Sequence, residues 1–167
     1  DDHETYREQA RPQGGRGRAM MMDNLYLICS IAGQPVAIHA AKVESVVDIG
    51  AVSPVPLAPP HVAGLAALRS RLLTIICCEC ALGLSQTPRT NSRAVIVAVD
   101  GHQYGLLVGT IDDARVIERE VEPVRARLQP GWARVAIGMI EHDGEALLLV
   151  DPEKLIAGGE EFFALAS

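Results

Sequence analysis

The sequence predicts a mainly all-β fold, and three observations carry that prediction. From Asn24 onward, short apolar runs are separated by turn residues about every eight to twelve positions, which is typical of a β-barrel or β-sandwich. Apolar residues seldom recur with helical periodicity. The chain has 167 residues, of which 49% are hydrophobic and 22% charged, so it is long enough to enclose the core of one globular domain.

The composition excludes several classes of partner. The 21 acidic residues outnumber the 15 basic ones, and the resulting net charge of -6 opposes binding to nucleic-acid phosphates. Only 4% of the residues are aromatic, so platforms for base stacking are not expected. No apolar stretch reaches the roughly 18 residues that a transmembrane helix needs, and we expect no membrane insertion.

The two ends of the chain differ in amino-acid composition from its middle. Residues 1–22 are rich in Gly, Arg, Gln and Pro and have almost nothing to bury, which predicts a disordered tail. Residues 23–157 are expected to form the folded domain, and residues 158–167 a loose C-terminal tail. Four unevenly spaced cysteines do not suit a disulfide scaffold, which favours a reducing compartment and a cytoplasmic location.

The first elements of the domain are expected to be a hairpin and a third strand. Strands at Leu25–Ile31 and Val36–His39 flank a turn composition of Ala, Gly, Gln and Pro. The segment Ala40–Ile49 begins as a helical turn and becomes a strand at Val46, because β-branched residues fit a pleated surface. The four prolines of Ser53–Pro60 exclude a helix interior or a central strand, so this segment is predicted to be a connector.

The middle of the domain is predicted to form several strands. Strands at Val62–Leu68 and Leu72–Cys78 are joined by three polar residues and followed by a polar loop at 85–92. Ala94–Val99 is apolar on both faces, as a strand covered on both sides should be. Asp100 and Gly101 then supply the left-handed residues of a tight turn.

Further strands are expected at Tyr104–Val108 and Ala114–Glu118, before a polar stretch at Glu120–Trp132 that is predicted to be a loop or a short helix. The clearest hairpin of the sequence joins Val135–Glu141 to Ala146–Val150 through an Asp-Gly turn. A short helix should follow, because Asp151 can cap it, Pro152 suits its first position and Gly158 its end.

Motifs of enzymes are mostly missing from the sequence: it has no phosphate-binding Gly-rich loop, no nucleophile elbow and no paired-histidine metal motif. Cys77-Cys78-Glu79-Cys80 is the strongest candidate for chemistry. On a strand, Cys78 and Cys80 would share one face and Cys77 the other, so the three thiols would not converge on one ion. Buried packing residues are the favoured interpretation, with Cys29 as the missing ligand if a metal is bound.

The other polar candidates are expected to be ordinary surface residues. No histidine has a partner at catalytic or ligand spacing, so all are expected on the surface: His3, His39, His61, His102 and His142. Asp112-Asp113 and Glu118–Glu122 are interpreted as solvated edges. Arg69 and Arg71 interrupt a long apolar region, where an arginine either pairs with a buried carboxylate or anchors a helical partner.

Three stretches carry a resemblance to a known family. Gly33–Val47 contains the segment Lys42-Val43-Glu44-Ser45-Val46, which is similar to a K-V-x-x-V element. Gly64–Ile76 resembles the signature G-x-x-N-L-R-G-x-x-x-P-x-x-D-L, and Leu147–Leu155 resembles L-I-L-V-D-x-E-K-L. Together they make residues 24–156 similar to the CheW family of chemotaxis coupling proteins, which implies two small five-stranded SH3-like barrels packed side by side.

Several positions of the signature differ here. Ala67 stands for its Asn, Ser70 for its second Gly, Thr74 for its Pro and Cys77 for its Asp, while Arg69 is kept. Leu107–Ile111 likewise lacks the acid of the family's V-V-D-x-V segment. These differences leave open a CheW-like module that serves another two-component or localisation pathway.

The resemblance implies a non-catalytic adaptor without metal or cofactor. Its partners would be the regulatory domain of a CheA-like histidine kinase and the cytoplasmic tip of methyl-accepting chemoreceptors, with recruitment to membrane receptor arrays. In the family, the groove between the barrels accepts receptor helices, and the barrel ends meet the kinase domain. The groove residues carried over to this chain are Val43, Val46, Leu68, Arg69, Leu106, Val108 and Ile111. A small thiol- or metal-dependent enzyme that uses Cys77, Cys78 and Cys80 is the alternative from a different class.

Overall fold

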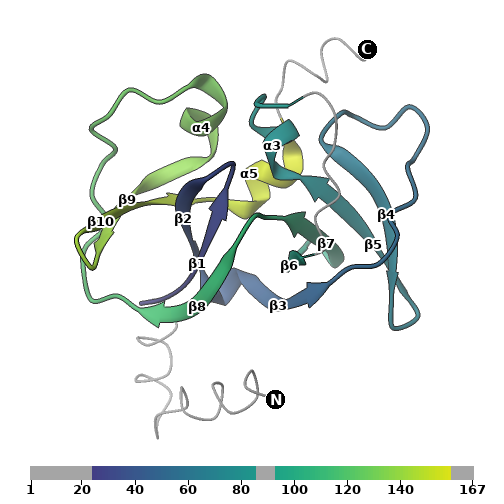
Figure 1. Ribbon diagram of the computed structural model, residues 1–167, viewed down its shortest axis with the longest axis horizontal. Coiled ribbons are helices and arrows are strands. Elements are labelled where there is room, and N and C mark those ends of the chain that lie inside the picture. Colours follow the sequence, from purple (N-terminus) through teal and green to yellow (C-terminus); the bar gives the residue numbers. More distant parts are fainter. Residues whose placement is uncertain (1–23, 86–92, 159–167) are drawn as a thin grey trace, which may run out of the picture.

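A computed structural model describes residues 24–85 and 93–158 of the chain, which form two five-stranded sheets (Figure 1). Sheet A has the order β8-β1-β2-β10-β9 and sheet B the order β3-β6-β7-β5-β4. The strands of sheet A are β1 (Leu25–Ile31), β2 (Gln34–His39), β8 (Ile111–Val116), β9 (Ala136–His142) and β10 (Glu145–Val150). Those of sheet B are β3 (Val43–Asp48), β4 (Val62–Leu68), β5 (Arg71–Cys77), β6 (Arg93–Val99) and β7 (His102–Leu107).

The chain passes between the two sheets twice. Sheet B is one continuous segment, whereas sheet A combines the first two strands with the last three. The 3₁₀ turn η1 (Ala40–Lys42) carries the chain into sheet B, and the link from β7 to β8 carries it back. The predicted architecture of two five-stranded β units is therefore confirmed, and the units are covalently intertwined.

Three short helices complete the described fold: α3 (Cys78–Ala81), α4 (Pro130–Val135) and α5 (Pro152–Ala157). The predicted cap of α5 is present, since the Asp151 carboxylate accepts a hydrogen bond of 3.0 Å from the backbone N–H of Glu153. Gly158 follows with a φ of 72°. In Figure 1, α5 lies at the centre of the view between the two sheets, with α3 close above it.

Apolar residues in the described part of the chain form three clusters, and the largest one lies between the sheets. It takes Leu27, Ile38 and Leu148 from sheet A together with Val95 and Leu106 from sheet B, and we call it the shared core. Each sheet also has a smaller core of its own, and we call a sheet with that core barrel A or barrel B. Because the largest cluster needs both sheets, neither barrel can bury its apolar surface alone.

The two barrels have the same construction. In both sheets the strands in the order given pair antiparallel, antiparallel, parallel and antiparallel. Strands β8, β9, β10, β1 and β2 therefore correspond to β3, β4, β5, β6 and β7. Helices α5 and α3 correspond too, since α5 follows β10, α3 follows β5, and these two strands correspond to each other.

A connector closes the outer edge of each barrel over a glycine. Ser53 pairs with Leu65 of β4, and Glu122 pairs with Met139 of β9. A Cβ on Gly64 would lie 2.2 Å from the Ser53 carbonyl oxygen, and one on Gly138 would lie 2.7 Å from that of Glu122. Only glycine lets the connector come this close, and the connector occupies backbone groups that an open edge would expose.

Each described two-residue hairpin turn has positive φ at both positions, the conformation that matches strand twist. Three of these turns end in glycine, at Gly33, Gly101 and Gly144. The turn between β4 and β5 consists of Arg69 (φ 49°) and Ser70 (φ 67°), so both of its residues have a side chain that disfavours this conformation.

Two predictions about local structure were wrong. Strand β8 begins at Ile111, ahead of the expected Ala114, because its first pairing is with Cys29 of β1. Cys77 ends β5 and Cys78–Ala81 is helical, so the four-residue cysteine motif does not continue a strand. The expected tail at 1–22, and most of the expected tail at 158–167 and of the polar loop at 85–92, lie outside the described residues.

Candidate partner-binding surfaces

The residues predicted to line one groove lie in three different environments. Leu106 is 0% exposed and Val108 1% exposed, and both belong to the shared core. Their interpretation as groove residues does not fit this structure, because a side chain without solvent contact offers no surface to a partner. Alternating apolar patterns do not distinguish a strand covered by a second barrel from one that faces solvent.

A second group lies at the edge of the shared core. Val43 and Val46 of β3 and Ile111 of β8 are half-buried and pack against this cluster from both barrels. Strands β3 and β8 are the edge strands of their sheets, drawn along the lower part of Figure 1. We call these three residues the seam, the place where the shared core reaches the surface.

The third group belongs to the β4–β5 hairpin. Leu68 is half-buried against the core of barrel B, while Arg69 is exposed at the turn. Beyond the turn, Arg71 is exposed and Leu72 is 71% exposed. Neither arginine has an ion pair within the described part of the chain, so pairing with a buried carboxylate is ruled out there.

Residues 69–72 together form the hairpin arm, which carries two cations and an exposed leucine. Leu72 was missed in the sequence, although the charges at Arg69 and Arg71 mark the place where the apolar run is interrupted. A second exposed site lies on the Pro-rich connector, where Val55 is 38% exposed and Leu57 is fully exposed with a φ of 62°. No signal in the sequence separates these two residues from core aliphatics.

Hydrogen bonds join the barrels at the three helices. Arg134 of α4 donates to the carbonyl of Ala81 in α3 and to that of Lys154 in α5, both at 2.7 Å. Ala81 is the last residue of α3, where carbonyls lack partners within the helix, whereas the carbonyl of Lys154 also accepts the backbone N–H of Gly158 that follows α5. Arg134 therefore links elements of both barrels through its guanidinium group.

His61 is buried at the same junction, so its prediction as a surface residue was wrong. It is 2% exposed, and its Nε2 lies 2.8 Å from the carbonyl oxygen of Ile156 in α5, to which it donates. Burial lowers the pKa of His61, the positive charge of Arg134 lowers it further, and the backbone hydrogen bond opposes the shift. His61 is therefore held in its neutral form in contact with the end of α5.

The other polar candidates do not converge on a site. His102 is exposed, and His39 is half-buried with its ring 4.8 Å from that of Tyr26. His142 lies 3.4 Å from the carboxylate of Asp143 at a hairpin turn. Asp112 and Asp113 are exposed, while His3 is outside the described residues.

All four cysteines are buried and carry free thiols. Burial raises the pKa of Cys29 to about 12. The pKa of Cys78 is raised well above its usual range by burial and by nearby groups, first among them Cys29. Within residues 24–85 and 93–158, no group of three or more His, Cys, Asp or Glu side chains is arranged to hold a metal ion.

The described residues thus define a double-barrel β domain whose distinctive surfaces are the seam and the hairpin arm. The chain belongs to the CheW-like domain family, whose model matches residues 25–160. It is 24% identical over 135 residues to the chemotaxis protein CheW of Rhizobium meliloti (strain 1021), covering 78% of this chain and 85% of that protein. The family predicted from the sequence is therefore confirmed.

A solved structure shows the same fold. The scaffolding protein TtCheW from Thermoanaerobacter tengcongensis is similar with a TM-score of 0.65 and 22% sequence identity. The match covers 78% of this chain and 85% of that one. None of the helices in the described ranges is long and apolar enough to cross a membrane.

Proposed function

We propose that this protein is a non-catalytic adaptor of the cytoplasm that couples a CheA-type histidine kinase to chemoreceptors. Its membership of the CheW-like family and the chemotaxis and scaffolding names of its relatives support this proposal. The observation that carries it is the seam, where half-buried aliphatic residues of both barrels reach the surface beside one common core.

The seam suits the cytoplasmic tip of a receptor, which would present a helical hairpin. An amphipathic helix binds through a few aliphatic anchors spaced along one face. Val43, Val46 and Ile111 provide such anchors, and the core beneath them is already formed, so little ordering is needed on binding. Strands β3 and β8 are the edge strands of their sheets, so no neighbouring strand of the same sheet covers their outer side where a partner would bind.

The hairpin arm suits the regulatory domain of the kinase, which would meet the end of barrel B. Arg69 and Arg71 would pair with carboxylates, and Leu72 would fill an apolar pocket. The strain of the Arg69–Ser70 turn supports a binding role, because a sequence selected only for stability would place glycine there.

The first experiment measures the affinity of a receptor-tip fragment by titration calorimetry. We expect Ile111→Asp and Val46→Asp to weaken binding at least about tenfold, because a charge would be desolvated against the partner. Val116→Asp is the matched control, since Val116 is exposed on the same strand as Ile111 and does not pack against the shared core. Fluorescence of Trp132, the single tryptophan, shows whether each variant is folded.

If a folded Val46→Asp variant binds the fragment as the native chain does, the seam is not the receptor site. Should that variant unfold, Val46→Thr replaces it, because threonine keeps the side-chain shape and adds only a hydroxyl group. Val108→Asp is expected to unfold the protein, since Val108 is buried in the shared core.

The second experiment tests the hairpin arm against the isolated kinase regulatory domain. Replacing Arg69 and Arg71 by Ala, and separately Leu72 by Ser, should weaken this complex while leaving the receptor fragment bound. These side chains are exposed, so stability should change little. Equal affinity of all variants for the kinase domain would refute the assignment of the arm.

A second candidate function is a CheW-like module in another two-component or localisation pathway. The departures at Ala67, Ser70, Thr74 and Cys77 from the family signature favour it. A folded protein that binds neither the receptor fragment nor the kinase domain would support this alternative. The thiol-enzyme alternative on Cys77, Cys78 and Cys80 is disfavoured, because burial raises the pKa of both Cys78 and Cys80.

A further inference from the structure

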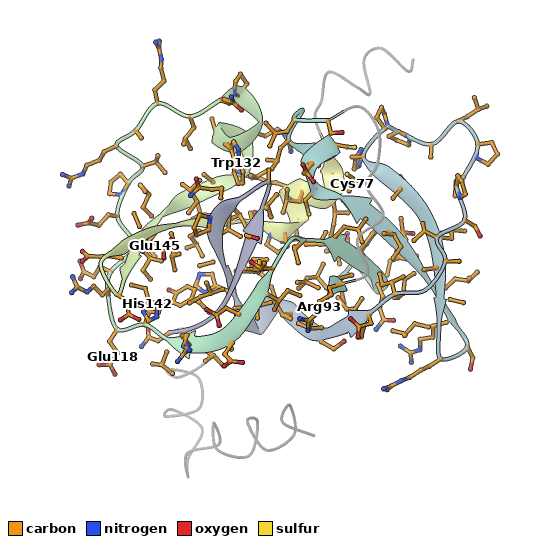
Figure 2. All side chains as sticks on the ribbon, viewed as in Figure 1. Cys77, Arg93, Glu118, Trp132, His142 and Glu145 are labelled. Carbon is orange, nitrogen blue, oxygen red and sulfur yellow. The ribbon has the colours of Figure 1, made fainter. Side chains whose placement is uncertain are left out.

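Two cysteines meet where β5 runs into α3. Cys77 ends the strand and precedes the helix, and its sulfur accepts a hydrogen bond of 3.4 Å from the backbone N–H of Cys80. The Cys80 side chain is also hydrogen-bonded to that of Cys77. Figure 2 shows Cys77 at this junction, beside α3. Cys77 and Cys80 thus form a Cys-x-x-Cys pair at the start of a helix, the spacing of reactive dithiol pairs.

In barrel A, the position that corresponds to Cys77 holds Asp151, which caps its helix. Asp151 precedes α5 as Cys77 precedes α3, and its backbone N–H donates to Val135 as that of Cys77 donates to His61. The Asp151 carboxylate caps its helix with a bond of 3.0 Å. Sulfur is a weak acceptor, so capping alone does not account for a cysteine at position 77.

The other two cysteines do not share this arrangement. Cys78 points into the shared core, which also contains Cys29. The pair Cys77 and Cys80 alone combines the spacing of one helical turn with direct contact between the two side chains.

We propose that Cys77 and Cys80 form a reversible intramolecular disulfide with a low-molecular-weight disulfide, such as glutathione disulfide, as the oxidant. The Cys77 thiol loses its proton to water, and the thiolate attacks one sulfur of the oxidant, releasing one glutathione thiolate. The Cys80 thiolate then attacks the Cys77 sulfur of the mixed disulfide, and the second glutathione leaves. The two protein thiols lose two electrons and two protons, which end up on two molecules of reduced glutathione.

The order of attack follows from the environments of the two sulfurs. Burial, and after it the hydrogen bond to Cys77, raises the pKa of Cys80 to about 12, so Cys80 is a poor first nucleophile. Both residues are buried, so the oxidant gains access when α3 opens. This helix has four residues, and a single turn opens at lower free energy than a sheet.

The disulfide would act on the junction between the barrels. It would tie the first turn of α3 to the end of β5, and the carbonyl of Ala81 in that helix accepts a hydrogen bond from Arg134. Oxidation would therefore limit the opening of a helix that links barrel B to α4 and α5. The result is a redox-dependent clamp that is independent of the proposed adaptor function.

The test equilibrates the full chain with graded ratios of oxidised to reduced glutathione. After acid quenching and denaturation, free thiols are alkylated, and tandem mass spectrometry locates the alkyl groups. We expect oxidising ratios to remove two of the four alkylatable thiols, those of Cys77 and Cys80, and excess reduced glutathione to restore them. The oxidised protein should also melt at a higher temperature than the reduced one.

Cys77→Ser should abolish both the thiol loss and the shift in melting temperature, whereas Cys78→Ala should keep them. The native chain in denaturant serves as the positive control for oxidation. The proposal is overturned if the folded native chain keeps four alkylatable thiols at every ratio while the denatured chain is oxidised. A disulfide that involves Cys29 or Cys78 in place of this pair would overturn it as well.

Discussion

Barrel A joins β9 to β10 through Asp143 and Gly144, whereas barrel B joins the corresponding strands through Arg69 and Ser70. The strand pairing around the two turns is the same, and the backbone conformation is the same at both positions. In barrel A the second turn residue is Gly144, and glycine tolerates a positive φ best. In barrel B the second turn residue is Ser70, whose side chain disfavours a positive φ.

The same contrast recurs where each central strand meets its helix. Barrel A uses Asp151, a strong capping residue, and barrel B uses Cys77, a weak one. Barrel A thus has the residue favoured for stability at both corresponding positions, whereas barrel B departs from it at both. Both departures therefore fall in barrel B, which also carries the hairpin arm.

The largest expected effect concerns Gly64 and Gly138, the glycines over which a connector closes the edge of each barrel. Gly64→Ala should lower the free energy of unfolding by about 3–4 kcal/mol, and Gly138→Ala by about 2 kcal/mol. Gly64 has the shorter approach to a backbone oxygen and a φ of 149°, so barrel B should be the more sensitive. Denaturant unfolding monitored by Trp132 fluorescence measures both. Gly50→Ala is the control, because its Cβ would meet nothing within 4 Å; equal losses at Gly50 and Gly64 would refute the closure argument.

The next effect concerns the link between the barrels. Arg134→Ala should lower the free energy of unfolding by about 2–3 kcal/mol, because the carbonyls of Ala81 and Lys154 both lose a charged donor. Arg134→Lys should lose part of this, since an ammonium group does not span both carbonyls. Lys42→Ala removes only the exposed pair with Glu153, worth below about 1 kcal/mol, and provides the comparison. A loss at Arg134 no larger than that at Lys42 would show that the junction does not depend on the guanidinium group.

A smaller effect separates the two corresponding turns. Ser70→Gly should raise the free energy of unfolding by about 1 kcal/mol, and Gly144→Ser should lower it by a similar amount. Both residues are exposed, so packing does not obscure the backbone effect. Thermal and denaturant unfolding of the two variants measure it. If Ser70→Gly also weakened binding of the kinase domain, the strain would contribute directly to recognition.

The smallest effect expected is on the pH dependence of stability. Burial lowers the pKa of His61 below that of the unfolded chain, so between the two pKa values the unfolded chain binds the extra proton. The contribution of His61 to stability is therefore complete above the unfolded pKa of about 6.5 and is lost as the pH falls through the folded value. His61→Gln keeps a donor for the Ile156 carbonyl and should flatten the stability profile between pH 7 and pH 5. An unchanged profile would show that His61 is not responsible.

The sequence alone determined the local features of the fold. Asp-Gly turns, the Pro-rich connector and the Asp151-Pro152 cap depend on neighbouring residues, so the hairpins and α5 were predicted correctly. Three family motifs indicated two five-stranded barrels, which composition and spacing do not. The sequence also indicated the aliphatic core, since few aromatic residues are present.

Contacts between distant residues decided the rest. The burial of Leu106 and Val108 follows from barrel packing, because an apolar strand residue becomes core only when a second sheet covers it. The burial of His61 beside Ile156 joins residues 95 positions apart. The equivalence of Cys77 and Asp151 depends on two sheets with the same pairing order, one of them assembled from both ends of the chain. The order of residues along the chain does not show these relations, because each depends on which side chains are buried together in the folded protein.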